Sequence, residues 1–341
     1  MTAFGLDISD TLVRLAVLEK RGAQFFLPVR AEITIPPEVI VDGEIRQPTV
    51  AAHLLAQLVK ASRARTKRAI VSLPERQTFL KLISLPADRG VTEASVQAEA
   101  SQHIPFAPGE MYFDWYLLPQ KNSLGERQVV IGAAAKTLVD AYLSVLHDAG
   151  IETMSIEPES LSLVRAIWQK GQQSDAAIVL DLGRTRSTII LVRDEIVRFS
   201  VTVRYAGKDL NRFIADELKI SDDQAEKAKK IFGLDPRLGR GVLYKVLSPQ
   251  MDILAEKIRD VESFYVEHFI DHRPIKEVTL TGSGAMLKGI DQQLSQRLNQ
   301  TVVIHPSWVY QQLRAHDPSL PIDVGLGYTT AFGLALKNFS P

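Results

Sequence analysis

Two stretches with the same pattern, half a chain apart, most constrain the fold of this sequence. Residues 4–18 and 178–192 each give an apolar strand that carries an aspartate, a turn of small and polar residues, and a second apolar strand. Each is typical of a β-hairpin with an acid at its mouth. The two acids, Asp7 and Asp181, are 181 − 7 = 174 residues apart in a chain of 341. This spacing is a hint of duplication, although two such hairpins can also arise by chance.

Helix-like and strand-like segments alternate between and after the two hairpins. Apolar residues recur at helical spacing in some segments, and short apolar runs resemble strands in others. The helical segments are residues 50–64, 138–146, 210–218 and 254–265, and the strand-like runs are residues 69–73, 196–203 and 277–281. After the last strand we expect a Gly-Ser-Gly turn and then a helix through Leu298. The alternation predicts an α/β fold with a mainly parallel sheet in each half.

The segment from Pro86 to Gln120 interrupts this alternation with prolines and a cluster of aromatic residues. We interpret it as a small inserted subdomain, at about residues 86–122. The first domain is then placed at residues 1–172. The second is placed at residues 173–341, with a subdomain of its own at about residues 207–273.

Composition excludes several classes of function. The chain has 40 Lys+Arg and 40 Asp+Glu, so no excess of positive charge predicts a nucleic acid partner. The absence of cysteine excludes disulfides, thiolate zinc sites and cysteine nucleophiles. No apolar run approaches the roughly 18 residues of a membrane span, and no basic, apolar leader opens the chain. We therefore expect an intracellular, soluble protein that does not insert directly into the membrane.

Familiar catalytic motifs are missing, and five local features remain. Neither Gly282–Gly284 nor Gly325–Gly327 completes a dinucleotide fingerprint, and there is no P-loop. The remaining features are the two Asp hairpins, Glu157-Pro158, Glu226 with Lys229 on a polar helix, and the turn Thr281–Gly284. Hairpin turns can hold phosphate through backbone N–H groups, and carboxylates can hold Mg²⁺. Each feature can also be explained by structure alone. The aspartates can make turn hydrogen bonds, and Glu157-Pro158 can mark a helix start. The charged helix face can simply be solvated, and the Gly-Ser-Gly turn can be an ordinary connection.

In this order the five features resemble the actin/Hsp70/sugar-kinase ATPase fold, a clamp of two duplicated RNase H-like domains. Within that superfamily the chain most resembles the PilM family of actin-like proteins of type IV pilus assembly, with the FtsA family as a relative. The resemblance extends nearly end to end, and it rests on residues 5–8, 99–106, 206–210, 228–230 and 333–336.

The resemblance implies a role for each feature in binding ATP with Mg²⁺. The first phosphate loop would be formed by Asp7, Ser9, Asp10 and Thr11, and the second by Asp181, Gly183, Arg184, Thr185 and Thr188. Asp7 and Asp181 would hold Mg²⁺, directly or through water, and Glu157 would orient a water or the metal as the catalytic residue. The ribose and adenine would be contacted by Gly207, Glu226, Lys229, Gly282, Ser283 and Gly284. The family usually has small residues where this chain has Asp10, Arg184 and Arg186, so we expect nucleotide binding rather than efficient turnover.

The resemblance also implies a partner. Family members hold the N-terminal cytoplasmic tail of a PilN-like single-span inner-membrane protein. The groove would be lined by Ile104, Phe106, Tyr112 and Trp115, whose alternative role is the core of the small subdomain. The chain would then be a cytoplasmic scaffold at the inner face of the membrane, within a pilus, secretion or competence complex, and able to self-associate. The alternatives are an active ATPase or small-molecule kinase of the same fold, for which no catalytic base can be assigned, and an FtsA-like division protein.

Overall fold

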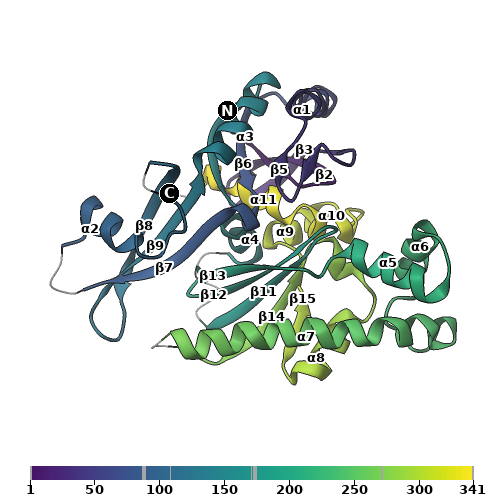
Figure 1. Cartoon of the computed structure of the whole chain (residues 1–341). Coiled ribbons are helices and arrows are strands. Elements are labelled where there is room, and N and C mark those ends of the chain that lie inside the picture. The colour runs from purple at the N-terminus through teal and green to yellow at the C-terminus, as the bar shows by residue number, and fades with distance from the viewer. Residues whose placement is uncertain are drawn as a thin grey trace. The chain divides into compact units, whose positions relative to one another are not determined.

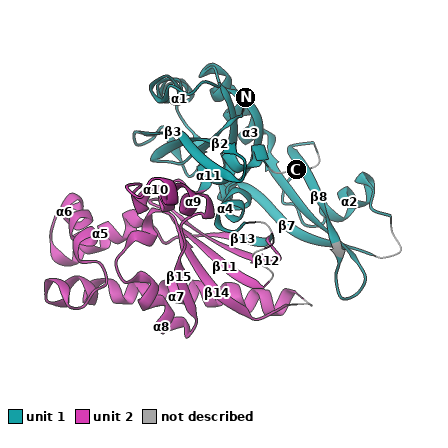
Figure 2. Cartoon of the chain, turned by 180° about the vertical axis from the view of Figure 1, so that it is seen from behind, with its two compact units in different colours: residues 1–169, 196–200, 330–341 teal, residues 170–195, 201–329 magenta. Residues whose placement is uncertain are grey.

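The computed structural model describes residues 2–86, 90–107, 109–169, 171, 175–269 and 272–339. The chain divides into two compact units (Figures 1 and 2). Unit 1 comprises residues 1–169, 196–200 and 330–341, and unit 2 comprises residues 170–195 and 201–329.

A five-stranded mixed sheet forms the first part of unit 1, in the order β10-β6-β1-β2-β3. Its strands are β1 (Phe4–Ile8), β2 (Leu12–Arg21), β3 (Gln24–Thr34), β6 (Arg68–Leu73) and β10 (Glu152–Pro158). β1 pairs antiparallel with β2, which confirms the predicted N-terminal hairpin. β1, β6 and β10 run parallel, so their carboxyl ends meet at one edge of the sheet. A separate small hairpin is formed by β4 (Ile40–Val41) and β5 (Glu44–Ile45).

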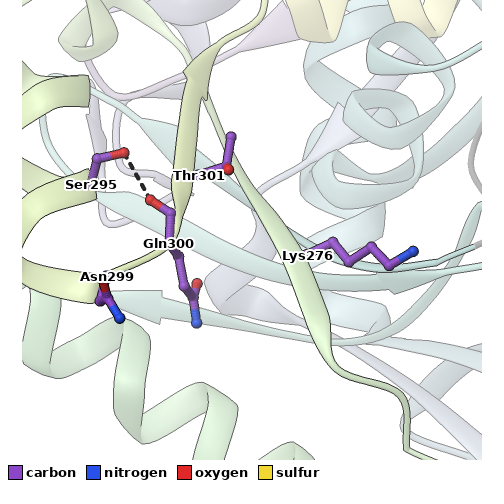
Figure 3. Close-up of a pocket in the computed structure, with 5 residues that line it drawn as sticks. All are labelled: Lys276, Ser295, Asn299, Gln300 and Thr301. Atoms are coloured by element: carbon purple, nitrogen blue, oxygen red, sulfur yellow. Dashed lines mark hydrogen bonds between the residues drawn. The ribbon is translucent and has the colours of Figure 1, made fainter.

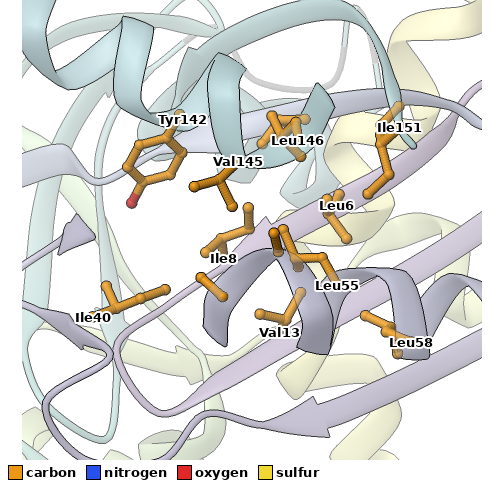
Figure 4. Packing of buried hydrophobic residues seen from close by; sticks show 14 of the residues in the cluster. Leu6, Ile8, Val13, Ile40, Leu55, Leu58, Tyr142, Val145, Leu146 and Ile151 are labelled. Carbon is orange, nitrogen blue, oxygen red and sulfur yellow. The ribbon is translucent and has the colours of Figure 1, made fainter. Parts of the chain in front are cut away.

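The core of this part lies between the sheet and helices α1 (Pro48–Ser62) and α3 (Lys136–Asp148). Leu55 and Leu58 of α1 are one helical turn apart, and both are buried with the β-strand residues (Figure 4). Proline at the first position of α1 suits a helix start, because it donates no N–H. The predicted helices and strand at residues 50–64, 138–146 and 69–73 are thus confirmed within a few residues. Unit 1 also contains α4 (Glu159–Ile167), most of α11 (Thr329–Leu336) and the 3₁₀ turn η4 (Lys337–Phe339).

An antiparallel group of strands forms the second part of unit 1. It contains β7 (Thr78–Leu85), β9 (Arg127–Ala135) and, at the edge, β8 (Met111–Lys121), with η1 (Glu75–Gln77) before it. Phe199 of β13 (Ile196–Val203) pairs antiparallel with Lys81 of β7. Helix α2 (Glu93–Ala100) packs against these strands through Val96 and Ala100. The aromatic cluster that marked the insert therefore lies on the edge strand β8.

The sheet of unit 2 has the order β15-β14-β11-β12. Its strands are β11 (Ala176–Leu182), β12 (Ser187–Arg193), β14 (Ile275–Thr281) and β15 (Thr301–Ile304). β11 pairs antiparallel with β12 and parallel with β14, and β14 pairs parallel with β15. The second predicted hairpin is therefore confirmed. Nearly every residue of β11 and β12 is buried, which explains why these strands read as continuous apolar runs.

Helices cover this sheet and extend beyond it (Figure 1). They are α5 (Gly207–Leu218), α6 (Asp222–Phe232), α7 (Val242–His268), α8 (Ile290–Leu298), α9 (Trp308–His316) and α10 (Ile322–Gly327), with 3₁₀ turns η2 (Leu238–Gly241) and η3 (Ser283–Met286). The expectation of one helix running from the Gly-Ser-Gly turn to Leu298 is wrong. Gly289, with φ 79°, separates η3 from α8, because this left-handed conformation cannot continue a helix.

The two sheets share one topology, which confirms the duplication predicted from the spacing of the acids. In unit 1 the hairpin β1–β2 is followed by parallel strands β6 and β10, and in unit 2 the hairpin β11–β12 is followed by β14 and β15. Asp7 and Asp181 each stand near the carboxyl end of the first strand of a hairpin. The α/β class is therefore confirmed. Among the described residues, no helix has both the length and the hydropathy to cross a membrane.

Candidate functional site

The turn of the first hairpin is fixed by its own polar atoms. The backbone N–H and the hydroxyl of Ser9 both donate to the carbonyl of Leu12, at 3.0 and 2.7 Å. The carbonyl of Thr11 accepts a hydrogen bond from the backbone of Ile35 at 2.9 Å. Two residues of the predicted phosphate loop thus shape the turn itself.

Asp10, another residue of the predicted first phosphate loop, anchors the small hairpin β4–β5. Its Oδ1 accepts a hydrogen bond from the backbone N–H of Gly43 at 2.9 Å, and the hydroxyl of Tyr142 donates to the carbonyl of Gly43 at 2.8 Å. Gly43 has φ 83°, and a β-carbon there would lie 2.5 Å from Pro74. The negative charge of Asp10 therefore has a structural partner.

Three polar residues lie side by side at the carboxyl ends of β1, β6 and β10. They are the predicted site residues Asp7 and Glu157, with Ser72 between them. Ser72 is opposite Glu157 in the register of β6 and β10, and its hydroxyl contacts the carboxylate of Asp7 at 3.4 Å. The sheet thus brings Asp7 and Glu157 to one edge of unit 1.

Glu157 is buried and lies between two cations. Its Oε1 accepts from Arg165 Nη1 at 2.6 Å, and its Oε2 accepts from Arg165 Nη2 at 3.2 Å and from Lys337 Nζ at 2.8 Å. Burial by itself raises the pKa of Glu157, but the hydrogen bonds and charges of Arg165 and Lys337 outweigh it, so this pKa is lowered. Arg165 also donates to the carbonyl of Gly333 at 2.8 Å, which ties β10 and α4 to α11. Both oxygens of Glu157 are thus engaged in holding unit 1 together.

Glu75 is a buried acid that the sequence analysis did not identify. Its Oε2 accepts a hydrogen bond from the backbone N–H of Ser160 at 2.9 Å, in the first turn of α4, and its Oε1 accepts from the hydroxyl of Ser200. Burial raises the pKa of Glu75, against the lowering effect of these hydrogen bonds. A glutamate after a Leu-Pro dipeptide carries no local sign of this role, because both partners are remote in sequence.

In unit 2, the start of α5 is hydrogen-bonded to the turn of the hairpin β11–β12. The backbone N–H of Gly207 donates to the carbonyl of Gly183 at 3.1 Å, and that of Lys208 donates to the carbonyl of Arg184 at 2.9 Å. Glycine is required at position 183, because a β-carbon there would lie 2.3 Å from the carbonyl of Arg186. The predicted second phosphate loop and Gly207 therefore adjoin one another.

The Gly-Ser-Gly turn lies against the same hairpin. Asp181 pairs with Thr281 in the register of β11 and β14, and with Thr188 in that of β11 and β12. Gly282 has φ 78°, and a β-carbon there would lie 2.2 Å from Oδ1 of Asp181. Gly284 lies close to Leu182, since a β-carbon on this glycine would lie 2.7 Å from the β-carbon of that leucine. Ser283 begins η3 directly after this contact, and Thr185 lies half-buried in the hairpin turn.

Charged side chains of helix α6 contact the start of α5 and the turn of the hairpin β11–β12. Nζ of Lys229 donates to the carbonyl of Gly207 at 2.8 Å, and Oε2 of Glu226 lies 3.8 Å from Nη2 of Arg184. Burial lowers the pKa of Lys229 to about 8; the charges of Arg184 and Lys230 act in the same direction, and Glu226 opposes them. The hydrogen bond from Lys230, at 2.7 Å, is the main cause of a lowered pKa of Glu226. At neutral pH this cluster holds a carboxylate among three cations.

Asn211 is a second residue that sequence reasoning missed. It is buried in α5, and its Nδ2 contacts Oε2 of Glu226 at 3.4 Å. Its Oδ1 is buried without a hydrogen-bond partner in the part of the chain that the structure describes. A buried acceptor of this kind is costly unless something donates to it. The helical spacing of its apolar neighbours Leu210 and Ile214 drew attention to the core face of α5 rather than to this side chain.

The donor set around the hairpin of unit 2 suits a nucleotide. Arg184 and Lys229 supply positive charge, while Asp181, Glu226 and Asn211 supply oxygen acceptors beside glycines that permit close approach. Within the described residues, no cluster of three or more acidic or histidine side chains could hold a metal alone. Mg²⁺ commonly takes one or two carboxylates and completes its shell with phosphate and water, so Asp181 fits an ion held in that way.

The four predicted partner-binding residues differ in accessibility. Ile104 is buried in the small core between α2 and the strands β7–β9, and Phe106 and Trp115 pack against that core. Tyr112 is exposed on β8; its hydroxyl donates to Oδ1 of Asp140 at 2.9 Å, and Nζ of Lys136 lies 5.9 Å from its ring centre. Of the four, Tyr112 presents the most surface to a partner.

A shallow cavity of about 580 Å³ lies at the other end of β14 (Figure 3). It is lined by Lys276, Ser295, Asn299, Gln300 and Thr301. Lys276 is the second residue of β14. The last residue of this strand, Thr281, lies five residues or roughly 16 Å further along, and the Gly-Ser-Gly turn follows it. This cavity is therefore separate from the cluster around Asp181.

Comparison with known proteins identifies the family. The family model described as "Type IV pilus assembly protein PilM" matches residues 5–339. The cell division protein FtsA of Streptococcus pneumoniae serotype 2 (strain D39 / NCTC 7466) is 21% identical over 318 residues. That alignment covers 86% of this chain and 66% of the length of FtsA.

Solved structures with the same fold cover nearly the whole chain. The structure titled "PilM-PilN type IV pilus biogenesis complex" matches with a TM-score of 0.83 and 21% identity, over 100% of this chain and 99% of the other. MreB5 of Spiroplasma citri bound to ADP matches with a TM-score of 0.52 and 14% identity, over 95% of this chain and 98% of the other. The fold is that of the two-domain actin-like ATPases, as predicted. Because the family model spans almost the entire sequence, the chain belongs to the PilM family of actin-like type IV pilus assembly proteins.

Proposed function

We propose that this protein binds ATP with Mg²⁺ on unit 2, around the turn of the hairpin β11–β12, and works as a cytoplasmic scaffold of a pilus assembly complex. In this proposal Asp181 carries the Mg²⁺ ion with phosphate and water. The turn from Gly183 to Thr188 contacts the phosphates, and Glu226, Lys229 and the Gly-Ser-Gly turn contact the nucleoside. The assignments of Asp7, Ser9, Asp10 and Thr11 to a phosphate loop remain predictions.

The observation that carries the proposal is the meeting of residues from four separate segments. The turn at Gly183 and Arg184 contacts Gly207 and Glu226, Lys229 contacts Gly207, and Gly282 lies against Asp181. These are the segments that the resemblance assigns to nucleotide binding. The related fold of MreB5 has been solved with ADP bound, which is consistent with such a site.

Nucleotide is retained as a structural or switching ligand in this proposal, with little turnover. Glu157, the predicted water-orienting residue, has both carboxylate oxygens engaged by Arg165 and Lys337. A general base needs a free lone pair within reach of the water that it activates. An engaged carboxylate with a lowered pKa is poorly suited to that task.

Calorimetric titration of the intact protein with Mg-ATP tests the binding proposal. Asp181→Ala is expected to weaken binding at least tenfold, because it removes the carboxylate beside Gly282. Asp216→Ala, an exposed acid further along α5, is the matched control and should leave the affinity unchanged. Absence of binding to the unaltered chain, or equal affinities for the two variants, would refute the assignment.

The second part of the proposal concerns the partner. The chain holds the N-terminal cytoplasmic tail of a PilN-like inner-membrane protein and is thereby kept at the inner face of the membrane. The fold match to a structure titled as a PilM–PilN complex supports this partner. Self-association remains a prediction.

An immobilised tail peptide tests the partner proposal by capture of the purified chain. Tyr112→Ala should reduce capture, because Tyr112 is the most exposed of the predicted contacts. Tyr116→Ala, on the same exposed face of β8, is the control for a general loss of aromatic surface. Capture that is unchanged by Tyr112→Ala would exclude Tyr112 from the groove. No capture of the intact chain would reject the partner.

A further inference from the structure

Two short segments of this neutral chain are strongly basic. Residues 60–68 contain five cations and no acid, and no large exposed apolar side chain lies among them. The second segment is residues 227–245, where apolar side chains are exposed as well. Residues 227–245 contain six cations, namely Lys227, Lys229, Lys230, Arg237, Arg240 and Lys245, and one acid, Asp235. The segment therefore carries 6 − 1 = +5, whereas the whole chain has 40 basic and 40 acidic residues. Lys288 adds a further cation from a distant part of the sequence, because its Nζ donates to the carbonyl of Ile231 at 2.7 Å.

Exposed aliphatic side chains lie among these cations. Ile231 at the end of α6, Leu238 in η2 and Val242 at the start of α7 are 56, 38 and 47% exposed. The turn between α6 and α7 folds back on the end of α6, since a β-carbon on Gly239 would lie 3.1 Å from the ring of Phe232. In Figure 1, α6 and the start of α7 lie at the same end of unit 2.

The turn that joins these helices holds one non-glycine residue, Arg240, in the left-handed conformation. Gly239, Arg240 and Gly241 are all left-handed, with φ of 55, 55 and 69°. A non-glycine residue in this region is uncommon and costs free energy, and such conformations cluster at functional positions. Arg240 is exposed to solvent, so its side chain is accessible to a ligand.

We propose that Ile231, Leu238 and Val242, with the neighbouring cations Arg240 and Lys245, form a basic–aliphatic surface that docks on an anionic lipid bilayer. Arg237 is left out of this surface, because Asp235 accepts two hydrogen bonds from its guanidinium. Cations pair with lipid phosphates, and short aliphatic side chains enter the boundary between headgroups and acyl chains. Single-stranded nucleic acids are usually held by aromatic side chains that stack on bases, whereas the large exposed side chains here are aliphatic. This inference does not depend on the nucleotide or tail-peptide proposals.

Sedimentation with vesicles tests the basic–aliphatic surface directly. The intact protein should bind vesicles of equal parts phosphatidylglycerol and phosphatidylcholine, and should stay in solution with pure phosphatidylcholine. Raising the salt from about 0.1 M to about 1 M shortens the Debye length from about 10 Å to about 3 Å and should release the protein. The double variant Arg240→Asn, Lys245→Gln should lower binding by about fivefold for each lost cation.

Matched controls separate this surface from general effects of charge and apolar area. Arg63→Asn removes another exposed arginine with a left-handed backbone (φ 56°), in unit 1, and Asn tolerates that conformation at both positions. Leu238→Ser should weaken binding, whereas Leu124→Ser, at an exposed leucine in unit 1, should not.

Three results would overturn the proposal. One is equal binding to neutral and anionic vesicles, or to neither. Another is an Arg240→Asn, Lys245→Gln variant that binds as well as Arg63→Asn. The third is binding to polyglutamate or single-stranded DNA without binding to vesicles, which would assign the surface to an acidic protein or a nucleic acid.

Discussion

Glu157 shows how one buried side chain can join three elements of a unit. Replacing it by Ala leaves Arg165 and Lys337 without their carboxylate and should destabilise the chain by about 2–4 kcal/mol, reduced from a fully buried pair because both cations keep some contact with water. Equilibrium urea unfolding at pH 7 measures this loss. The control is Glu152→Ala, on the same strand as Glu157. It removes an exposed ion pair with Arg68 of the neighbouring strand β6 and should cost less than about 1 kcal/mol.

The lowered pKa of Glu157 also gives this stability a pH dependence. A carboxyl whose folded pKa is lower than its unfolded value, about 4.3, stabilises the folded chain above the unfolded pKa. This contribution is lost as the pH falls through the folded pKa. In Glu157→Gln the difference in stability from the unaltered chain should therefore shrink on acidification below about pH 4. A difference that stays constant with pH would contradict the ion pair as its source.

Lys229 places a titrating cation inside the proposed nucleotide site. Its pKa of about 8, set mainly by burial, means that the lysine is mostly charged at pH 7 and mostly neutral at pH 9. Affinity for Mg-ATP, measured by titration at pH 7, 8 and 9, should therefore fall as the pH rises. Lys229→Arg should flatten this dependence, because arginine stays charged throughout. Lys208→Arg, on α5, serves as the control. A pH profile that is unaltered by Lys229→Arg would exclude Lys229 as the titrating group.

Single residues were also where the sequence was least informative. The resemblance in the order of motifs predicts that Asp181, Glu226 and Lys229 lie near one another. In the structure Glu226 lies 3.8 Å from Arg184, which follows Asp181 in the turn of the same hairpin, and Lys229 contacts Gly207. By contrast, Arg165 and Lys337 reach Glu157 across 8 and 180 residues, and neither shows a local pattern. Such pairings depend on how helices pack, which no periodicity encodes.

At the scale of elements, close helix packing in unit 1 depends on glycine. A β-carbon on Gly333 of α11 would lie 1.9 Å from the carbonyl of Ser162 in α4, where neither backbone can yield easily. Gly333→Ala should therefore destabilise the chain by about 3 kcal/mol, the upper end of overpacking costs. Gly132→Ala is the matched control, because its β-carbon would meet nothing closer than 3.8 Å. Comparison of urea midpoints measures both, and equal midpoints would show that α11 can shift freely.

Elements with a strong local pattern were predictable, and those shaped by tertiary contacts were not. Alternating or continuous apolar runs located the hairpins β1–β2 and β11–β12 and the strand β14. The break between η3 and α8 was missed, because the left-handed Gly289 looks in sequence like any glycine near a helix. The strand β8 was also missed, although its side chains alternate. Met111, Phe113, Trp115 and Leu117 pack against the small core with α2, and Tyr112 and Tyr116 between them are exposed.

At the scale of the whole molecule, unit 2 carries two proposed surfaces with separable ligands. The nucleotide cluster surrounds Asp181, and the basic–aliphatic surface surrounds Arg240. A ligand that binds the folded state alone stabilises it by RT ln(1 + [L]/Kd), about 2.7 kcal/mol at a concentration of 100 Kd. Mg-ATP at that excess should raise the thermal midpoint of the intact chain by several degrees.

Asp181→Ala and Arg240→Asn should affect the two ligands separately, each weakening the binding of one ligand only. Asp181→Ala should lose the thermal shift with Mg-ATP and keep its binding to anionic vesicles, whereas Arg240→Asn should keep the shift and bind anionic vesicles about fivefold more weakly. Lys229 and Lys230 lie three and four residues after Glu226 on α6, and Ile231 of the basic–aliphatic surface follows them, so both ligands would approach the same helix. If each variant impaired both ligands equally, the two surfaces would have to be treated as a single anion-binding region of unit 2.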